Sequence, residues 1–193
     1  MSAQDVYDDV CARLGIYDAP PIHVVDLVNA AARVVTTEAT KNSGTELVWV
    51  NRIIEIDASR WLAASHEQRE LLIAHELTHL FAAQRVGGGG YTKDGENHGY
   101  AFMSGFLFLA SQLDFKKAKL TELAKWHAIK YEIDYQHLDL TVSAALTATN
   151  IFDAMQRVSA HDMPVPLCWR QRFALFGICP TFILFYIYAY FNF

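Results

Sequence analysis

The chain has 193 residues, a formal net charge of −5 and a pI near 5.9. This length fits one domain with a core of its own, and the acidic balance excludes a general attraction to phosphate backbones, so we do not expect direct nucleic-acid binding. Three scattered cysteines without a CxxC pair, and a polar N-terminus unlike a signal peptide, predict a reducing, cytoplasmic setting.

The first predicted elements are helices. Apolar residues recur at i, i+4 and i+8 within residues 3–15, and Gly15 is typical of a position just after a helix. After the break at Pro20-Pro21, the apolar residues of segment 24–32 predict a second helix.

Strand signals follow. Segments 33–37, 46–50 and 53–57 are rich in Val, Ile, Thr and Trp, and turn residues separate them at Asn42-Ser43-Gly44 and at Asn51-Arg52. We therefore expect a small antiparallel sheet of about three strands.

The next predicted helix carries the sequence motif that is most informative about the function of the protein. Ser65 and Gln68 have the spacing of a capping box, which predicts a helix from just after Ser65 to a stop at Gly87. Within it, residues 75–79 read His-Glu-Leu-Thr-His. Residues i and i+4 share one helix face, so both imidazoles can reach one Zn²⁺ ion while the glutamate points at its open side. This layout is typical of a metal-dependent hydrolase.

Helices also dominate the rest of the chain. Four consecutive glycines at 87–90 predict a loop beside the histidine helix. Helical patterns then cover residues 95–112, with Asp94 as the cap, and residues 115–133 and 141–158, and a break containing proline follows at 163–166.

The C-terminal segment 173–193 contains no charged residue and is preceded by Arg170 and Arg172. Twenty apolar residues can span a bilayer, and flanking arginines would keep the preceding domain on the cytoplasmic face. Gly177 and Pro180 equally fit a buried terminal element of the domain. Both interpretations, a membrane anchor and a buried element, stay open.

A catalytic zinc site needs three protein ligands and a water, so two histidines leave one ligand to be found. Glu96 is our first choice, because it lies in the first turn of the next predicted helix, after a loop long enough to fold that helix back. His98 is the second choice. The other downstream candidates are Asp94, Asp114 and His127. A histidine six residues after the motif is excluded, because position 85 is Arg85.

Three segments share their order and spacing with a known family. They are Ile53-Ile54-Glu55-Ile56-Asp57, then Arg69 with Ala74 to Leu80, and then Glu96 followed by Gly99, Ala101, Phe102 and Phe106-Leu107. Over about residues 20–115 the chain resembles the ImmA/IrrE family of metallo-endopeptidases, which have a short sheet, an AHELxH helix and a later helix that supplies a glutamate. Thr78 and Tyr100 depart from this pattern, because the family usually has Gly and Asn there.

We expect one zincin-like metallopeptidase domain over residues 1–172, of which the resemblance covers about residues 20–115. The resemblance implies His75, His79 and Glu96 as ligands of one Zn²⁺ ion, and Glu76 as the general base. It further implies that the substrate is a protein partner, such as a repressor or other transcriptional regulator of a phage or mobile element.

The sequence thus predicts an α+β fold, with the small sheet packed on a mainly helical domain, and a zinc-dependent endopeptidase. Two alternatives stay open. One is a non-catalytic regulatory or toxin-like module that binds a partner, and the other is a protease tethered to the membrane through residues 173–193. The residue that stabilises the oxyanion is not assigned, and Tyr91, His98 and Tyr100 are its nearest candidates.

Overall fold

The computed structural model describes residues 2–41, 47–84 and 98–161. Over these residues the fold is α+β, as predicted, with three strands and a majority of helices. The elements in chain order are α1 (Ala3–Arg13), β1 (Ile22–Val25), β2 (Ala32–Lys41), β3 (Leu47–Asp57), α2 (Ala58–Ala63), α3 (His66–Gln84), α4 (Tyr100–Gln112), α5 (Lys117–Lys130), α6 (Leu138–Thr147), α7 (Ile151–Val158) and the 3-10 helix η1 (Ser159–His161).

The chain divides into two compact units, Met1–Asp162 and Met163–Phe193. The second unit lies outside the described residues, and so do the predictions for residues 163–166 and 173–193. Within the described ranges, no helix is long and apolar enough to cross a membrane.

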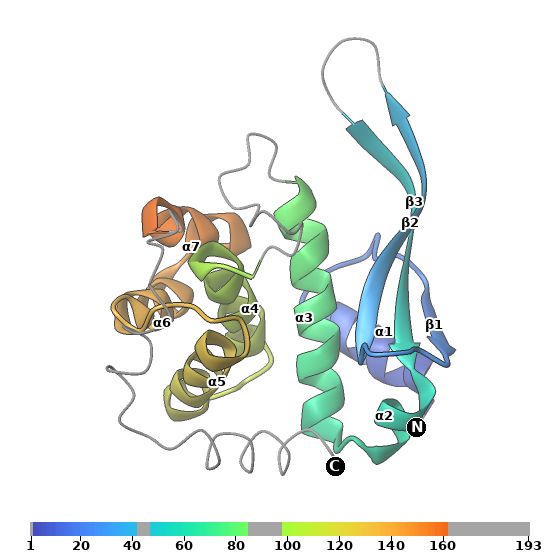
Figure 1. Ribbon diagram of the computed structural model, residues 1–193, viewed down its shortest axis with the longest axis horizontal. Helices are drawn as coiled ribbons and strands as arrows, with labels where there is room; N and C mark the ends of the chain where they lie inside the picture. The colour runs from blue at the N-terminus through green and yellow to red at the C-terminus, as the bar shows by residue number, and fades with distance from the viewer. Residues whose placement is uncertain (1, 42–46, 85–97, 162–193) are drawn as a thin grey trace. The chain divides into compact units, whose positions relative to one another are not determined.

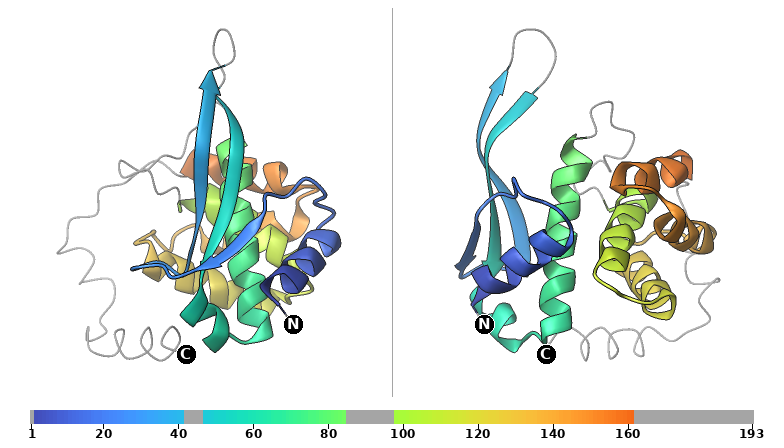
Figure 2. Two further views of the ribbon diagram at one scale, coloured as in Figure 1. Left: turned by 90° about the vertical axis from the view of Figure 1, so that its right-hand side faces the viewer. Right: turned by 180° about the vertical axis from the view of Figure 1, so that it is seen from behind.

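Helix α3 lies between the sheet and the helices α4 to α7 (Figures 1 and 2). Helix α1 packs on the sheet side of α3, and α4 packs on its other side. The far part of the β2–β3 ribbon extends beyond the end of α3. This arrangement places α3, with its two histidines, at the centre of the first unit.

The sheet has the order β1-β3-β2 and is mixed. β2 pairs with β3 antiparallel, as predicted, whereas β1 pairs with β3 parallel, from Ile22 opposite Ile54 to Val25 opposite Asp57. The predicted helix over residues 24–32 is therefore wrong. Its first residues are β-branched and favour a strand, and Asn29 has a φ of +67°, which a helix does not accept.

The third strand is also longer than predicted. Residues 47–50 and 53–57 form parts of one strand, and Asn51-Arg52 is not a turn but continues the pairing with β2. The pairing register shifts twice beside this point, between Thr36 and Glu38, where β2 has an extra residue, and between Glu38 and Ala39, where β3 has one, so the two strands stay paired through a local irregularity in each.

Local capping fixes the two helices that the sequence predicted best. In α1, Ser2 and Asp5 form a capping box, and the predicted helix over residues 3–15 is confirmed as Ala3–Arg13. At α3, the Ser65 hydroxyl accepts from the Gln68 N–H at 3.2 Å, while the Gln68 side chain accepts from the Ser65 N–H at 2.8 Å. The predicted stop at Gly87 and the glycine loop lie outside the described residues.

The later helices differ from the predictions mainly at their ends. Helix α4 is described from Gly99, its N-cap, whereas the predicted cap Asp94 lies in the part not described. The single helix predicted over residues 141–158 is two helices, because the Asn150 side chain accepts from the Asp153 N–H and starts α7 anew.

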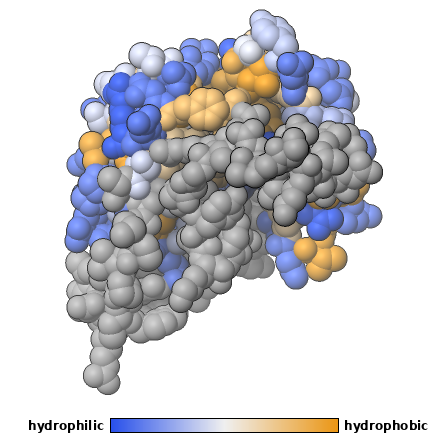
Figure 3. Space-filling view, turned by 90° about the horizontal axis from the view of Figure 1, so that it is seen from above, coloured by the Kyte–Doolittle hydropathy of each residue, from blue (hydrophilic) through white to orange (hydrophobic). Residues whose placement is uncertain are grey.

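Helix α4 is the apolar centre of the helical side. Ten of its residues are buried, and it packs against α3, α5, α6 and α7. The buried Ser104 hydroxyl donates to the Ala154 carbonyl of α7 at 2.9 Å. Outside this core, hydrophilic residues cover much of the visible surface, and apolar residues reach it in places (Figure 3). Because α4 packs against α3, the N-terminal end of α4 lies near the two histidines of α3.

Candidate metal centre

Helix α3 brings His75 and His79 together on one face, as the i, i+4 spacing predicted. Their rings lie 5.0 Å apart between centroids, edge to face. Glu76 follows His75 directly and is buried, with 3% of its surface exposed. Its Oε2 has no hydrogen-bond partner within the part of the chain that the structure describes. A buried carboxylate oxygen without a partner is costly, so it indicates a missing polar group at this place.

A third imidazole completes the cluster. His98 lies just before α4, and its Nε2 is 3.2 Å from the Nε2 of His75. Its ring centroid is 5.1 Å from that of His75 and 4.8 Å from that of His79. One nitrogen from each of the three residues lies within 4.8 Å of the other two. Three imidazoles at this separation are compatible with a single metal ion.

The structure thus places His98, the second choice from the sequence, at the site. Glu96, the first choice, lies outside the described residues, as does Asp94. Asp114 lies near Arg13, with its side chain almost fully exposed, and is not part of the cluster. His127 contacts the site but through the backbone of His98, as described below.

The three imidazoles share an aromatic floor. The centroid of the Phe102 ring lies 5.0 Å from the ring centroid of His75, 4.5 Å from that of His79 and 4.7 Å from that of His98. Phe106, one turn further along α4, packs edge to face on His75. These rings give the cluster an apolar side.

Burial keeps the three imidazoles neutral. It lowers the pKa of His75 well below its usual value, that of His79 to about 4 and that of His98 to about 2, and the neighbouring histidines lower the pKa of His75 and His98 further. Neutral imidazoles have a free lone pair, which is the form that binds a metal ion.

Burial acts in the opposite direction on Glu76. It raises the pKa of the carboxyl group to about 8, and the positive charge of Lys130 counteracts this in part. Burial thus disfavours the charged form of this carboxyl group, which is poorly solvated here.

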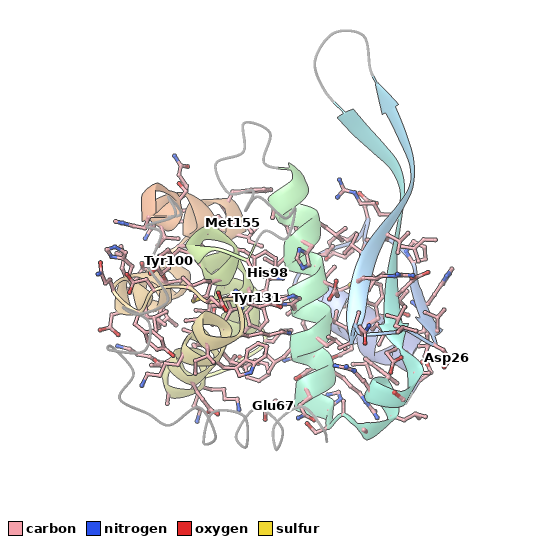
Figure 4. The ribbon with its side chains drawn as sticks, viewed as in Figure 1. Asp26, Glu67, His98, Tyr100, Tyr131 and Met155 are labelled. Carbon is pink, nitrogen blue, oxygen red and sulfur yellow. The ribbon has the colours of Figure 1, made fainter. Side chains whose placement is uncertain are left out.

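Helix α5 and its C-cap bring two residues to His98 in roles that the sequence did not predict. His127 was named only as a third ligand, and Tyr131 was not named. The His127 Nε2 lies 3.0 Å from the His98 carbonyl oxygen, and the Tyr131 ring stacks on the His98 ring at 3.8 Å between centroids. Figure 4 shows His98 and Tyr131 close together between α3 and α5. The i, i+4 spacing of these two residues is the signal in the sequence.

The two positions that departed from the ImmA/IrrE pattern have structural partners. Thr78 is fully buried, and its hydroxyl donates to the Ala74 carbonyl at 2.7 Å. The Tyr100 hydroxyl donates its proton in a hydrogen bond to the backbone carbonyl of Asp134. Tyr91, the other tyrosine considered for the oxyanion, lies outside the described residues.

Comparison with known proteins adds one finding. Residues 26–103 match the model of a family described as "Putative phage metallopeptidase". The match covers less than half of the chain, and it includes the histidine helix and His98. It supports a metallopeptidase, without singling out the ImmA/IrrE family. No curated protein and no solved structure matches the chain.

Proposed function

We propose that this protein is a zinc-dependent endopeptidase that hydrolyses a peptide bond of a protein partner. The observation that supports it best is the convergence of three neutral imidazole nitrogens beside a buried glutamate with an unpartnered oxygen. The match to a metallopeptidase family over the same residues supports it independently.

The residues present fit a zinc ion. In this proposal His75, His79 and His98 hold it, since three protein ligands leave the fourth position open to water. When bound, the ion would lower the pKa of that water towards 7 and polarise the carbonyl group of the peptide bond. Glu96 stays a prediction as a ligand, either in place of His98 or beside it.

Glu76 would act as the general base. Its position next to His75 on α3 would put its carboxylate close to a bound ion, where it could take a proton from the attacking water and later give it to the leaving amine. Phe102 and Phe106 shield the ligands from bulk water on one side. The zincin-like arrangement of sheet, helix and ligands is part of this proposal.

For the substrate, we propose a repressor or another transcriptional regulator of a phage or mobile element. The resemblance to ImmA/IrrE peptidases and the match to a family named for phages support this class. A cytoplasmic setting agrees with such a substrate. The non-catalytic binding module is the competing function, and Glu76 argues against it, because a purely structural metal site has no need of that carboxylate.

The test uses the full chain, purified and loaded with Zn²⁺, and the Glu76→Gln variant as a matched control. Both are incubated with candidate regulator proteins, beginning with any helix-turn-helix repressor encoded beside the gene, and the products are analysed by mass spectrometry. We expect about one Zn²⁺ per chain in both proteins and cleavage by the wild type alone. Absence of stoichiometric metal, or binding of the regulator without cleavage by the wild type, would contradict the proposal.

A further inference from the structure

Helix α5 presents two side chains to His98, one helical turn apart. His127 contacts the backbone of His98, and Tyr131 contacts its ring. Both residues lie beyond the segment that matches the metallopeptidase family, so the match does not assign them a role.

The His127 contact is a buried hydrogen bond of defined direction. A carbonyl oxygen only accepts, so the His127 Nε2 must carry the proton and donate it to His98. The His127 side chain is fully buried, and His98 is 8% exposed. In such surroundings the bond has little competition from water. It fixes the backbone of His98 where the chain enters α4.

The Tyr131 contact fixes the plane of the ring. The two rings are parallel to within 3°. A histidine that binds metal usually donates its second ring N–H to a carboxylate or carbonyl, which sets its orientation. The His98 Nδ1 is buried and has no such partner in the described segments. The stack with Tyr131 can supply the orientation that this hydrogen bond usually gives.

We infer that His127 and Tyr131 are positioning residues, which hold the backbone and the ring of His98 so that its Nε2 faces the one ion that His75 and His79 would also bind. This inference rests on the proposed function, since it assumes that His98 is a metal ligand. Neither residue touches the metal or the substrate in this scheme. Their effect on catalysis would therefore come through metal affinity and through the geometry of the ligand set.

The experiment compares a disruptive and a conservative variant at each position in the full chain. His127→Met removes the donor, whereas His127→Gln keeps an N–H that can reach the carbonyl. Tyr131→Leu removes the stack, whereas Tyr131→Phe keeps it. The dissociation constant for Zn²⁺ is measured by competition with a chromophoric chelator, and the visible absorption spectrum of the Co²⁺ form reports the coordination geometry.

We expect His127→Met and Tyr131→Leu to weaken Zn²⁺ binding about 10- to 100-fold and to change the Co²⁺ spectrum, as is usual for outer partners of a ligand. The conservative variants should stay close to the wild type. Ser104→Ala is the matched control, because it removes another buried side-chain bond to a carbonyl, the one to Ala154 of α7. It should lower stability and leave the Zn²⁺ affinity unchanged.

The outcomes separate the two proposals. A wild type that binds no Zn²⁺ overturns the proposed function and this inference together. If the wild type binds Zn²⁺ but His127→Met and Tyr131→Leu bind it equally tightly, only the positioning role is overturned. If His127→Met does not fold, the comparison of Tyr131→Leu with Tyr131→Phe decides, and equal affinities there contradict the inference.

Discussion

The ring of Tyr131 lies parallel to the imidazole of His98, with 3.8 Å between the centroids and 3° between the planes. His98 in turn faces His75 across 3.2 Å, nitrogen to nitrogen. The two contacts connect the end of α5, the segment just before α4 and the middle of α3. The cluster therefore depends on the packing of three helices, and the HExxH helix alone does not form it.

Replacing Glu76 by Gln should abolish cleavage and preserve metal binding. The amide has the shape of the carboxyl group but cannot take a proton from water, and general-base catalysis contributes about 10²- to 10⁴-fold to a rate. We expect a loss of at least about that size in the cleavage rate. Rates come from gel or mass-spectrometric time courses at saturating Zn²⁺, and retained proteolysis in the variant would refute the assigned role.

The identity of the third ligand can be tested with two neighbouring substitutions. His98→Ala removes an imidazole whose Nε2 lies 3.2 Å from the Nε2 of His75, a proposed ligand on α3. We expect it to weaken Zn²⁺ binding by more than the roughly 100-fold upper range seen for outer partners, and we expect Glu96→Ala to weaken it less. Chelator competition on both variants measures this, and the reverse ranking would make Glu96 the third ligand.

Arg13 should matter for stability through the buried acid that it pairs with. Its guanidinium donates to Glu70 of α3 and to the Leu113 carbonyl after α4, the latter at 3.0 Å. The Glu70 side chain is 9% exposed, so Arg13→Met leaves a largely buried carboxylate without its main partner. Because the Arg13 side chain is one-third exposed, we expect a moderate loss of about 1–3 kcal/mol in the free energy of unfolding.

The control for Arg13 is another arginine ion pair nearer the surface. Arg33 pairs with Glu55 at 2.7 Å, and the Arg33 side chain is 58% exposed. Arg33→Met should cost less than about 1 kcal/mol, because water screens exposed pairs. Urea unfolding of both variants gives the comparison, and equal losses would show that burial of the acid is not the deciding factor.

Asp57 should make the stability of the fold depend on pH in the acid range. It accepts from the Ser59 hydroxyl and from the N–H groups of Arg60 and Leu27, and these bonds lower its pKa to about 2. Its contribution is fully present above the unfolded pKa of about 3.9. It is lost as the pH falls from there through about 2.

The measurement for Asp57 is urea unfolding of the wild type and of Asp57→Asn at a series of pH values. The stability difference between them should be constant above about pH 5 and shrink as the pH falls towards 2, because the wild-type carboxyl group becomes protonated. A difference that does not change with pH would show that the charge of Asp57 contributes nothing to folding.

The sequence predicted those elements whose ends are set by neighbouring residues. The start of α3 could be predicted because its capping box joins Ser65 to a residue three positions away. Helix α1 could be predicted because its apolar residues recur at i, i+4 and i+8. β1 was missed because its strand character depends on parallel pairing with β3, which is distant along the chain. The split between α6 and α7 was missed because apolar periodicity continues across the break before Asn150.

The same distinction applies to the candidate site. His75, Glu76 and His79 could be predicted because one turn of helix fixes their relation. The sequence could not decide between Glu96 and His98 as the third member of the cluster, since the approach of His98 depends on how α4 packs against α3. His127 and Tyr131 lie on a third helix, and only tertiary structure brings them to His98.

Since the three imidazoles come from α3 and from the entry to α4, a peptide with the HExxH helix alone would offer two of them. Assembly of the full set needs the docked helices, so the free energy of capturing a cation would add directly to the free energy of folding. Chelators should therefore lower the stability of this protein, because a bound ion would link α3 to the segment that enters α4.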